Sequence, residues 1–326
     1  MPKSFVFASN KGGVGKSTLS TNIAASYALT HPDKNVLFVD LTFTKSISNI
    51  LLGDAAPPLQ NSLIQFIEAI DKKEKNIKKL ILFSIPVLAG IIHACSAFVA
   101  FCILVFDLVF IIMYYVYIGK MNKITIVSRK STLFPNMQVI VGGDLFAKSM
   151  KDKAFPLATA LKKWNLSGWE SADVVFFDVD NVLDDVAKFA FILANYVIIP
   201  TSLSAMDFER LCVDPRNTPI FEFLQSIPKK NRPKVKGVIF NRLKSINNSS
   251  ESDHESFTIA KAEMTIKREL EEKFREHIDV EHFVMMRELP ASLMQSMLDE
   301  KKPIAKLDDA THAVENLKVI CKRLID

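Results

Sequence analysis

The sequence predicts an α/β fold: a doubly wound, mostly parallel sheet with helices on both faces and an inserted hydrophobic helical hairpin. Three observations support this prediction. Short apolar segments alternate with amphipathic segments, a glycine-rich pattern joins the first apolar segment to the first helical one, and one stretch of forty residues is almost wholly apolar. A chain of 326 residues is long enough for one large or two ordinary domains.

Seven short apolar segments are the expected strands. They alternate with helical segments, which is the pattern of a parallel sheet covered by helices on both faces. The expected strands are Phe5–Ser9, Val36–Asp40, Gln138–Val141, Val174–Val179, Tyr196–Pro200, Val235–Phe240 and His282–Met286.

The expected helices are delimited by prolines and polar loops. Lys16–Leu29 is the first, and it ends before His31-Pro32 because the residue preceding a proline avoids the helical region. A polar loop at 246–256 has little to bury, and it precedes a charged amphipathic helix over Phe257–His277. The last helix lies within Pro303–Ile325.

Residues 11–18 read Lys-Gly-Gly-Val-Gly-Lys-Ser-Thr, between the first expected strand and the first expected helix. Glycines let the backbone curl with its N–H groups inward, and the following helix presents its positive end to the same place, which is typical of a phosphate-binding loop. Lys16 is expected to reach the β- and γ-phosphates, and the Ser17 hydroxyl to ligate Mg²⁺. The predicted phosphate-binding residues are Gly12, Gly13, Val14, Gly15, Lys16, Ser17 and Thr18.

The loop departs from the generic phosphate-binding pattern, because Asn10 replaces its first glycine and Lys11 precedes the glycine pair. The run Lys-Gly-Gly-Val-Gly-Lys-Ser resembles the deviant Walker A loop of the ParA/MinD family of partitioning and positioning ATPases. A glycine-rich turn with incidental lysines is disfavoured, because strand, loop and helix follow in the required order. The resemblance covers about residues 1–70 and 130–326. It implies an ATPase that binds ATP and Mg²⁺ as a homodimer, with Lys11 reaching across the interface to the other nucleotide.

Two strands resemble those that carry the family's metal-side carboxylates. Val36-Leu-Phe-Val-Asp40 is similar to the strand that ends in an aspartate near the Mg²⁺. Val174-Val-Phe-Phe-Asp178 resembles the Walker B strand, so Asp178 would hold a Mg²⁺-bound water. The resemblance thus implies a metal site built from Ser17, Asp40 and Asp178.

Two later segments resemble the family's adenine site. Gly237-Val-Ile-Phe-Asn-Arg242 is similar to the strand whose terminal asparagine contacts adenine, here Asn241. Arg287-Glu-Leu-Pro290 and the segment after it resemble the adenine-side loop and closing helix. Asn241 and Pro290 are therefore the implied adenine contacts.

One departure from the family pattern concerns the attacking water. The family places a second aspartate two residues after the position of Asp40, and here that residue is Thr42. A threonine hydroxyl can orient a water molecule but carries no negative charge. Loss of a water-positioning carboxylate can cost orders of magnitude in rate, so slow turnover is expected.

A second departure follows the Walker B aspartate, where Val179-Asp180-Asn181 replaces the usual Thr-Pro-Pro. Asp180 either replaces the missing carboxylate from the opposite strand end or caps a helix that starts near Leu183. Under the first interpretation, the catalytic candidates are Lys11, Lys16, Asp40 and Asp180.

Residues 80–119 contain one histidine and one aspartate among otherwise apolar or small residues. A helix needs about twenty residues to cross the hydrocarbon, so this run supplies roughly two short spans. Basic residues flank both sides, and the nucleotide motifs before and after the run must share a compartment, so an even number of crossings is expected. The expected domains are therefore an ATPase domain at 1–79 and 120–326 and a transmembrane or membrane-inserted hairpin at 80–119.

This organisation predicts a cytoplasmic ATPase domain attached to the inner or cytoplasmic membrane. A re-entrant or monotopic insertion, and a buried or partner-covered hairpin, remain open alternatives. The four cysteines show no paired metal spacing, which favours a reduced, cytosolic setting.

The formal net charge of +5 is mild and suggests an anionic partner only weakly. Basic residues gather at 229–236 and within the charged helix at 257–277. In ParA-like relatives similar surfaces bind DNA nonspecifically through phosphate contacts. Interleaved glutamates make a solvated salt-bridge face equally consistent with the helix.

The sequence thus predicts an ATP-controlled dimerising switch that partitions or positions DNA or another cargo, with a ParB-like adaptor that stimulates hydrolysis as an implied partner. The alternative is a membrane-anchored ATP-binding scaffold with little or no hydrolysis, serving a conjugation, secretion or envelope assembly. Thr42 favours the scaffold, whereas the intact Lys11, Lys16, Ser17 and Asp178 set indicates that nucleotide and Mg²⁺ bind.

Overall fold

A computed structural model describes residues 2–42, 46–53, 128–141, 158, 169, 171–202, 211, 218–243, 258–268, 280–308 and 310–326. The apolar run at 80–119 and the polar loop at 246–256 lie outside these ranges, so the predicted hairpin and domain boundaries stay predictions. Among the residues that the structure describes, no helix combines the length and the apolar character needed to span a bilayer.

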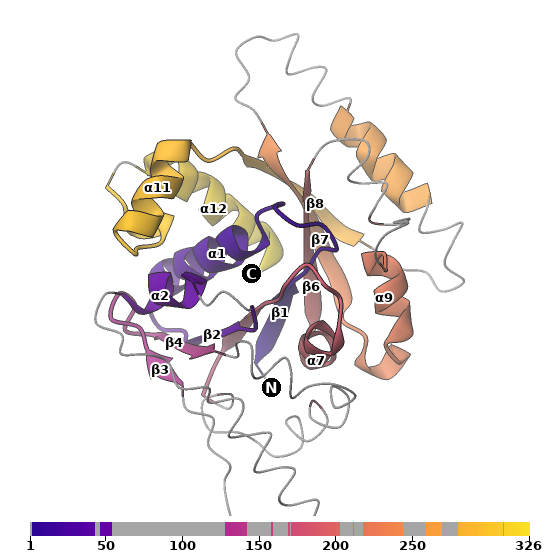
Figure 1. The fold of residues 1–326 in the computed structure, drawn as a ribbon, viewed down its shortest axis with the longest axis horizontal. Helices are drawn as coiled ribbons and strands as arrows, with labels where there is room; N and C mark the ends of the chain where they lie inside the picture. The colour runs from indigo at the N-terminus through magenta and orange to yellow at the C-terminus, as the bar shows by residue number, and fades with distance from the viewer. Residues whose placement is uncertain are drawn as a thin grey trace, which may run out of the picture.

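An eight-stranded sheet forms the centre of the fold (Figure 1). Its strands are β1 (Lys3–Phe7), β2 (Val36–Asp40), β3 (Arg129–Lys130), β4 (Met137–Val141), β5 (Val174–Asp178), β6 (Tyr196–Ser202), β7 (Lys234–Leu243) and β8 (Val280–Arg287). The strand order is β3-β4-β2-β5-β1-β6-β7-β8, and neighbours run parallel except β3, which pairs antiparallel with β4. The mostly parallel sheet predicted from the sequence is confirmed.

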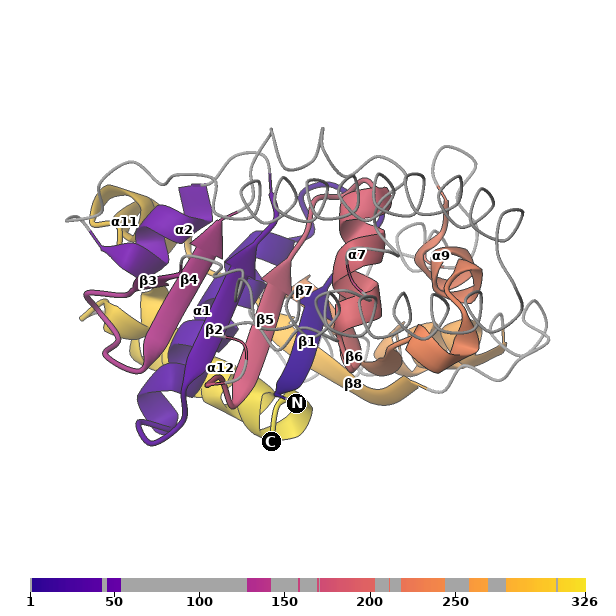
Figure 2. The same cartoon turned by 90° about the horizontal axis from the view of Figure 1, so that it is seen from below.

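Helices cover both faces of the sheet, as Figures 1 and 2 show. One face carries α1 (Lys16–Thr30), α2 (Ser46–Leu52), α11 (Ala291–Asp299) and α12 (Thr311–Leu324). The other carries α7 (Asp185–Leu193), α9 (Ile220–Ser226) and a helical stretch at 258–268. Short 3₁₀ turns, η1 (Lys229–Asn231) and η2 (Ile304–Lys306), precede β7 and α12. This is the doubly wound arrangement.

Two separate apolar cores lie on the two faces of the sheet. Along β5, Val174 and Phe176 pack into the core beneath α1 and α12, whereas Val175 and Phe177 pack into the core beneath α7 and α9. Burial of a large apolar side chain contributes about 1.5–3 kcal/mol. Because both faces of the central strands are buried, these strands are continuous apolar runs in the sequence.

All seven predicted strands are present, with differences at their ends. β1 lies at Lys3–Phe7 rather than at Phe5–Ser9, because Ala8 and Ser9 already belong to the loop. The short edge strand β3 and the helix α2 are additions that the apolar pattern did not predict. A two-residue strand and a seven-residue helix are too short to give a periodic signal.

The helical predictions agree with the structure where it describes them. The first helix was predicted at Lys16–Leu29 and ends one residue later, at Thr30. The last helix, α12, lies inside the predicted Pro303–Ile325 segment. Of the predicted helix at Phe257–His277, residues 258–268 are helical, and 269–277 lie outside the described part of the chain.

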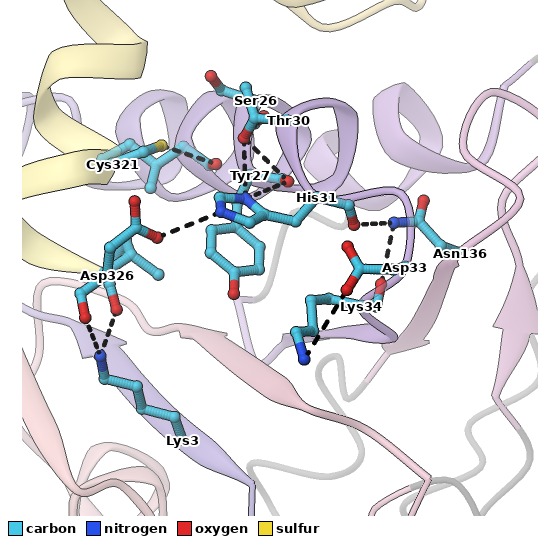
Figure 3. Close-up of polar contacts among 12 residues, drawn as sticks. Lys3, Ser26, Tyr27, Thr30, His31, Asp33, Lys34, Asn136, Cys321 and Asp326 are labelled. Atoms are coloured by element: carbon cyan, nitrogen blue, oxygen red, sulfur yellow. Dashed lines mark hydrogen bonds and ion pairs between the residues drawn. The ribbon is translucent and has the colours of Figure 1, made fainter.

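The amino-terminal end of the sheet is fastened by a set of polar contacts, several of which appear in Figure 3. The Asn136 side-chain amide donates to the carbonyl oxygens of Ala28 and His31, both at 3.0 Å, and of Lys34 at 2.9 Å. These bonds tie the end of α1 to the turn before β2. The Lys3 ammonium donates to the Asp326 carbonyl at 3.0 Å, which joins the start of β1 to the end of α12.

Candidate functional site

The candidate site lies at the carboxyl-terminal end of the parallel strands. The glycine-rich loop joins β1 to α1, and β5 pairs with both β1 and β2, so the ends of these three strands are adjacent. Ligands of open α/β sheets bind at this end, outside the carboxyl ends of the strands.

The loop backbone has the conformation that its glycines predict. Gly13 and Gly15 have φ values of 74° and 86°, in the left-handed region that disfavours residues with a Cβ atom. Gly15 is also the N-cap of α1 and has no side chain with which to cap the first-turn N–H groups. Free helical N–H groups at the positive end of the helix dipole attract a phosphate.

Asn241, at the end of β7, closes one side of the loop. Its side-chain amide donates to the Val14 carbonyl oxygen at 2.8 Å. A Cβ atom built on Gly15 would collide with this amide nitrogen. The loop and the predicted adenine-contacting asparagine are therefore held together by close packing that only glycine allows at position 15.

Lys16 is a largely buried cation, only 8% exposed. Its ammonium donates to the Lys11 carbonyl oxygen at 3.1 Å, so it reaches back across the loop. Burial lowers the pKa of Lys16, and the nearby carboxylates of Asp178 and Asp180 oppose this effect. An anion in the loop would give this buried charge a partner.

Asp178, at the end of β5, is a fully buried carboxyl group. Among the described residues, neither of its oxygens has a hydrogen-bond partner. Burial raises the pKa of Asp178 to about 8, and the neighbouring Asp40 carboxylate adds to the rise. Ser17, Lys16 and Ser20 lie near enough to oppose it without completing a hydrogen bond to either oxygen.

These residues fit a magnesium ion on their chemistry. A carboxylate with unshared oxygens beside the Ser17 hydroxyl is an oxygen donor set of the kind that Mg²⁺ prefers. A nearby divalent cation would also favour the ionised form of Asp178 over the protonated one. The sequence-predicted metal residues Ser17 and Asp178 are thus brought together at one place.

Asp40 is paired with Asp178 in the register of β2 and β5, but its hydrogen bonding is different. Its Oδ1 accepts from the Thr42 N–H at 2.9 Å and from the Thr42 hydroxyl at 2.6 Å. Its Oδ2 accepts from the Ser48 hydroxyl of α2. The Thr42 hydroxyl therefore donates a hydrogen bond to Asp40, a contact that the sequence did not predict.

Asp180 does not cap the following helix, which corrects one of the two interpretations of this residue. The N-cap of α7 is Asp184, whose Oδ1 accepts from the N–H groups of Val186 at 2.9 Å and Ala187 at 3.1 Å. The predicted start near Leu183 was close, but two aspartates precede the helix and the nearer one caps it. Asp180 instead interacts electrostatically with Lys16.

A cavity of about 810 Å³ adjoins the loop. It lies between the loop and the segment that joins β8 to α11, and its lining includes Gly15, Thr18, Asn241, Leu289, Pro290 and Met294. Cavities of this volume, mostly apolar with a few placed polar groups, accommodate small-molecule ligands. The predicted adenine contacts Asn241 and Pro290 line the same cavity as the phosphate-binding loop.

Sequence reasoning missed Ser48 and Asp184 in this region. Asp184 carried a usable signal, since an aspartate directly before an apolar helical segment is a common N-cap. Ser48 carried none, because its role depends on where α2 packs. Lys11 lies at the start of the loop and is half-buried, and its predicted reach across a dimer is outside what a single chain can display.

Loops of this geometry, joining the first strand of a parallel sheet to the following helix, define P-loop nucleotide-binding domains. Residues 5–264 match the family model described as the CobQ/CobB/MinD/ParA nucleotide binding domain, and the chain belongs to this family. Comparison with curated proteins gives no match.

Several solved structures share the fold of this chain. An ATP complex of a variant of McdA from Cyanothece has a TM-score of 0.61 at 16% identity, covering 99% of this chain and 96% of that one. A plasmid partition protein from Borrelia burgdorferi B31, bound to AMPPNP, has a TM-score of 0.54 at 19% identity over 100% of both chains. The MinC:MinD cell division complex of Aquifex aeolicus contains a chain with a TM-score of 0.52 at 15% identity, covering 99% of this chain and 97% of that one.

Proposed function

We propose that this protein is an ATP-dependent, dimerising switch that positions DNA or another cargo. The observation that carries the proposal is the loop itself. Its left-handed glycines and buried Lys16 suit a phosphate, and the buried Asp178 beside it, whose oxygens have no hydrogen-bond partner among the described residues, suits a cation. Membership of the family and the fold shared with the ATP and AMPPNP complexes support the choice of nucleotide.

Each residue of the loop has a proposed task. The backbone from Gly12 to Thr18 would hold the phosphates, and Lys16 would neutralise the β- and γ-phosphate charge. Lys11 would extend to the nucleotide of a second copy, so that association and hydrolysis depend on each other. Asn241 and Pro290 would contact adenine in the cavity that they line.

Ser17, Asp178 and, from the adjacent strand, Asp40 are the residues that would hold magnesium. The ion would supply positive charge to the phosphate oxygens as negative charge develops on them. Asp180, whose carboxylate acts electrostatically on Lys16, would partly replace the second aspartate of the family pattern, at whose position this chain has Thr42. Asp184, and not Asp180, caps α7.

Nucleotide binding and dimerisation test the proposal separately. We expect the wild-type protein to retain ATP with Mg²⁺ and Lys16→Ala to lose it. Lys11→Ala should retain ATP at near wild-type affinity but fail to form ATP-dependent dimers, as measured by light scattering. A folded wild-type protein that retains no ATP with Mg²⁺ would overturn the proposal, and a Lys11→Ala variant that still dimerises would remove the cross-dimer role.

DNA is the cargo that the surface favours. A cavity of about 520 Å³ lies at the opposite end of the strands from the P-loop, lined by Lys3, Lys230, Arg232 and Lys234 and by no acidic residue of the described chain. Lys230 and Lys234 are exposed. Lys3 and Arg232 already donate to backbone carbonyl oxygens, so Lys230 and Lys234 are the ammonium groups that would contact DNA phosphates. Contacts to phosphates bind nucleic acid without sequence preference and weaken as salt rises.

Membrane attachment through residues 80–119 remains part of the proposal on sequence grounds alone. Carbonate extraction of membranes, compared with a chain lacking those residues, tests it directly. If the intact chain is extracted as readily as the shortened one, the membrane has no place in the function.

The second candidate function is an ATP-binding scaffold with little or no turnover. Thr42 favours it, because the threonine hydroxyl donates to Asp40 and is not a carboxylate. Phosphate release, measured with and without DNA, anionic vesicles or an adaptor of the ParB kind, separates the two. Release that none of these accelerates above background would favour the scaffold.

A further inference from the structure

The short helix α2 is fastened at both of its ends. At its amino-terminal end, the Ser48 hydroxyl donates to Asp40 Oδ2. At its carboxyl-terminal end, the hydroxyls of Ser131 and Thr132 donate to the carbonyl oxygens of Leu51 at 2.5 Å and Leu52 at 2.7 Å. Figure 2 shows α2 at the arrowhead end of the strands, the end that carries the P-loop.

Asp40 receives all of its described hydrogen bonds from two residues that follow it closely in the sequence, Thr42 and Ser48. Thr42 supplies two donors to Oδ1, one from its N–H and one from its hydroxyl, and Ser48 supplies one to Oδ2. Asp40 and Ser48 are both fully buried and Thr42 is 3% exposed. Since little water reaches these groups, a lost donor would not be replaced by solvent.

The neighbouring carboxyl groups of Asp40 and Asp178 differ in their hydrogen bonding. Asp178 has no described hydrogen-bond partner, whereas Asp40 has donors on both oxygens. A carboxylate fixed by donors on both sides keeps one orientation, and that orientation is set by where the donors sit. The Ser48 hydroxyl of α2 is the donor on one oxygen, and the N–H and hydroxyl of Thr42 are the donors on the other.

We infer that Ser48 and Thr42 are positioning residues whose hydroxyl groups fix the Asp40 carboxylate beside the magnesium site. The inference rests on the proposed function, because it concerns the same Mg²⁺ and ATP. Groups that orient the residues around a metal raise its affinity, and their loss typically costs roughly 10- to 100-fold in metal affinity or activity.

The experiment measures the Mg²⁺ concentration needed for half-maximal stabilisation of the full chain by AMPPNP, followed as a shift in thermal unfolding. A non-hydrolysable analogue is used so that turnover does not enter. Ser48→Ala removes one hydroxyl and should raise the required Mg²⁺ concentration roughly 10-fold or more. Binding of AMPPNP in excess EDTA should stay within about threefold of wild type, since the P-loop makes those contacts.

Ser131→Ala is the matched control. It removes a buried hydroxyl from the other fastening of α2, which donates to Leu51 and accepts from the N–H groups of Leu133 and Phe134, both at 3.1 Å. A merely structural role for Ser48 predicts that both variants lower the unfolding temperature and that neither changes the Mg²⁺ requirement. The positioning role predicts a changed requirement in Ser48→Ala alone.

A pair of variants at Thr42 keeps the inference open to test if Ser48→Ala folds poorly. Thr42→Ser retains the hydroxyl and should behave like wild type, whereas Thr42→Val retains the shape and should raise the Mg²⁺ requirement. The inference is overturned if the folded Ser48→Ala or Thr42→Val protein needs no higher Mg²⁺ concentration than wild type. It is also overturned if Ser131→Ala raises the required Mg²⁺ concentration as much as Ser48→Ala does. Failure of the wild-type protein to bind AMPPNP with Mg²⁺ would instead reject the proposed function, and this inference with it.

Discussion

Polar side chains at the two ends of the parallel strands differ in how fully they are hydrogen-bonded. At the amino-terminal end, the Asn136 amide bonds to three carbonyl oxygens, and Ser4 and Asn195 exchange hydrogen bonds of 2.9 and 3.0 Å (Figure 3 shows Asn136 and its neighbours). At the carboxyl-terminal end, Asp178 is buried with neither oxygen paired, and Lys16 is buried against it.

The difference has an energetic meaning. A buried polar group without a partner costs about 1–3 kcal/mol, and an unpaired charge costs more. The amino-terminal contacts therefore stabilise the fold, and the carboxyl-terminal groups reduce its stability until a ligand pairs them. The comparison teaches that a buried carboxyl group with neither oxygen paired lies at the binding end of this sheet. Buried groups without a partner in general do not mark that end, since the Thr21 and Ser26 hydroxyls of α1 also have none among the described residues.

The largest effect is expected from Gly15→Ala at the binding end. The left-handed backbone would cost about 1–2 kcal/mol, and the new methyl would displace the Asn241 amide. We expect ATP affinity to fall roughly 100-fold or more, about 2.7 kcal/mol, in a titration with Mg²⁺.

Gly12→Ala is the control for this variant. A Cβ atom there would lie 3.6 Å from the Asn181 amide nitrogen, an ordinary contact, so the folded protein should keep its stability. Equal thermal destabilisation by the two variants would contradict the role given to the left-handed backbone at position 15.

Asn136→Ala probes the opposite end of the sheet. Loss of the hydrogen bonds to Ala28, His31 and Lys34 should lower the free energy of unfolding by about 1–3 kcal/mol in a denaturant titration. ATP affinity of the folded variant should remain at the wild-type value, because the P-loop is at the other end of the strands. A large loss of ATP affinity would show that the two ends are not independent.

Asp178→Asn should raise the free energy of unfolding of the ligand-free protein by about 1 kcal/mol, the opposite direction to Asn136→Ala. The folded-state pKa of about 8 lies above the ordinary value of 3.8, so the folded wild-type chain holds a proton that the unfolded chain releases. Wild-type stability should therefore fall as pH rises from 3.8 to about 8, and the variant should lack this component.

The same variant should lose the stabilisation that ATP and Mg²⁺ give together. Thermal unfolding across this pH range, with and without Mg²⁺ and ATP, measures both effects. An Asp178→Asn protein that is less stable than wild type without ligand would contradict the expectation that the buried Asp178 carboxyl group lowers the free energy of unfolding.

The sequence was sufficient for those parts of the site that depend on local chain geometry. Glycines and a lysine between a strand and a helix fix the P-loop wherever they occur, and the apolar runs that end in Asp40 and Asp178 placed two strands correctly. The neighbouring order of β2, β5 and β1 then brings the loop and both carboxyl groups to one edge.

Contacts made by tertiary packing were beyond sequence reasoning. Nothing in the residues around Ser48 indicates that its hydroxyl would reach Asp40, because α2 is short and its placement depends on the core beneath it. The choice between Asp180 and Asp184 as the cap of α7 likewise depended on where the helix begins, and sequence patterns place boundaries least well.

The carboxyl-terminal fastening of α2 has a consequence for how the chain could have been assembled. The Thr132 N–H donates to the Leu52 carbonyl oxygen at 3.2 Å, so two segments that lie 80 positions apart in the sequence are joined side by side. The entropy cost of closing a loop rises only slowly with its length. The sequence between these two segments could therefore be lengthened, shortened or exchanged in evolution while the strands on either side keep their registers.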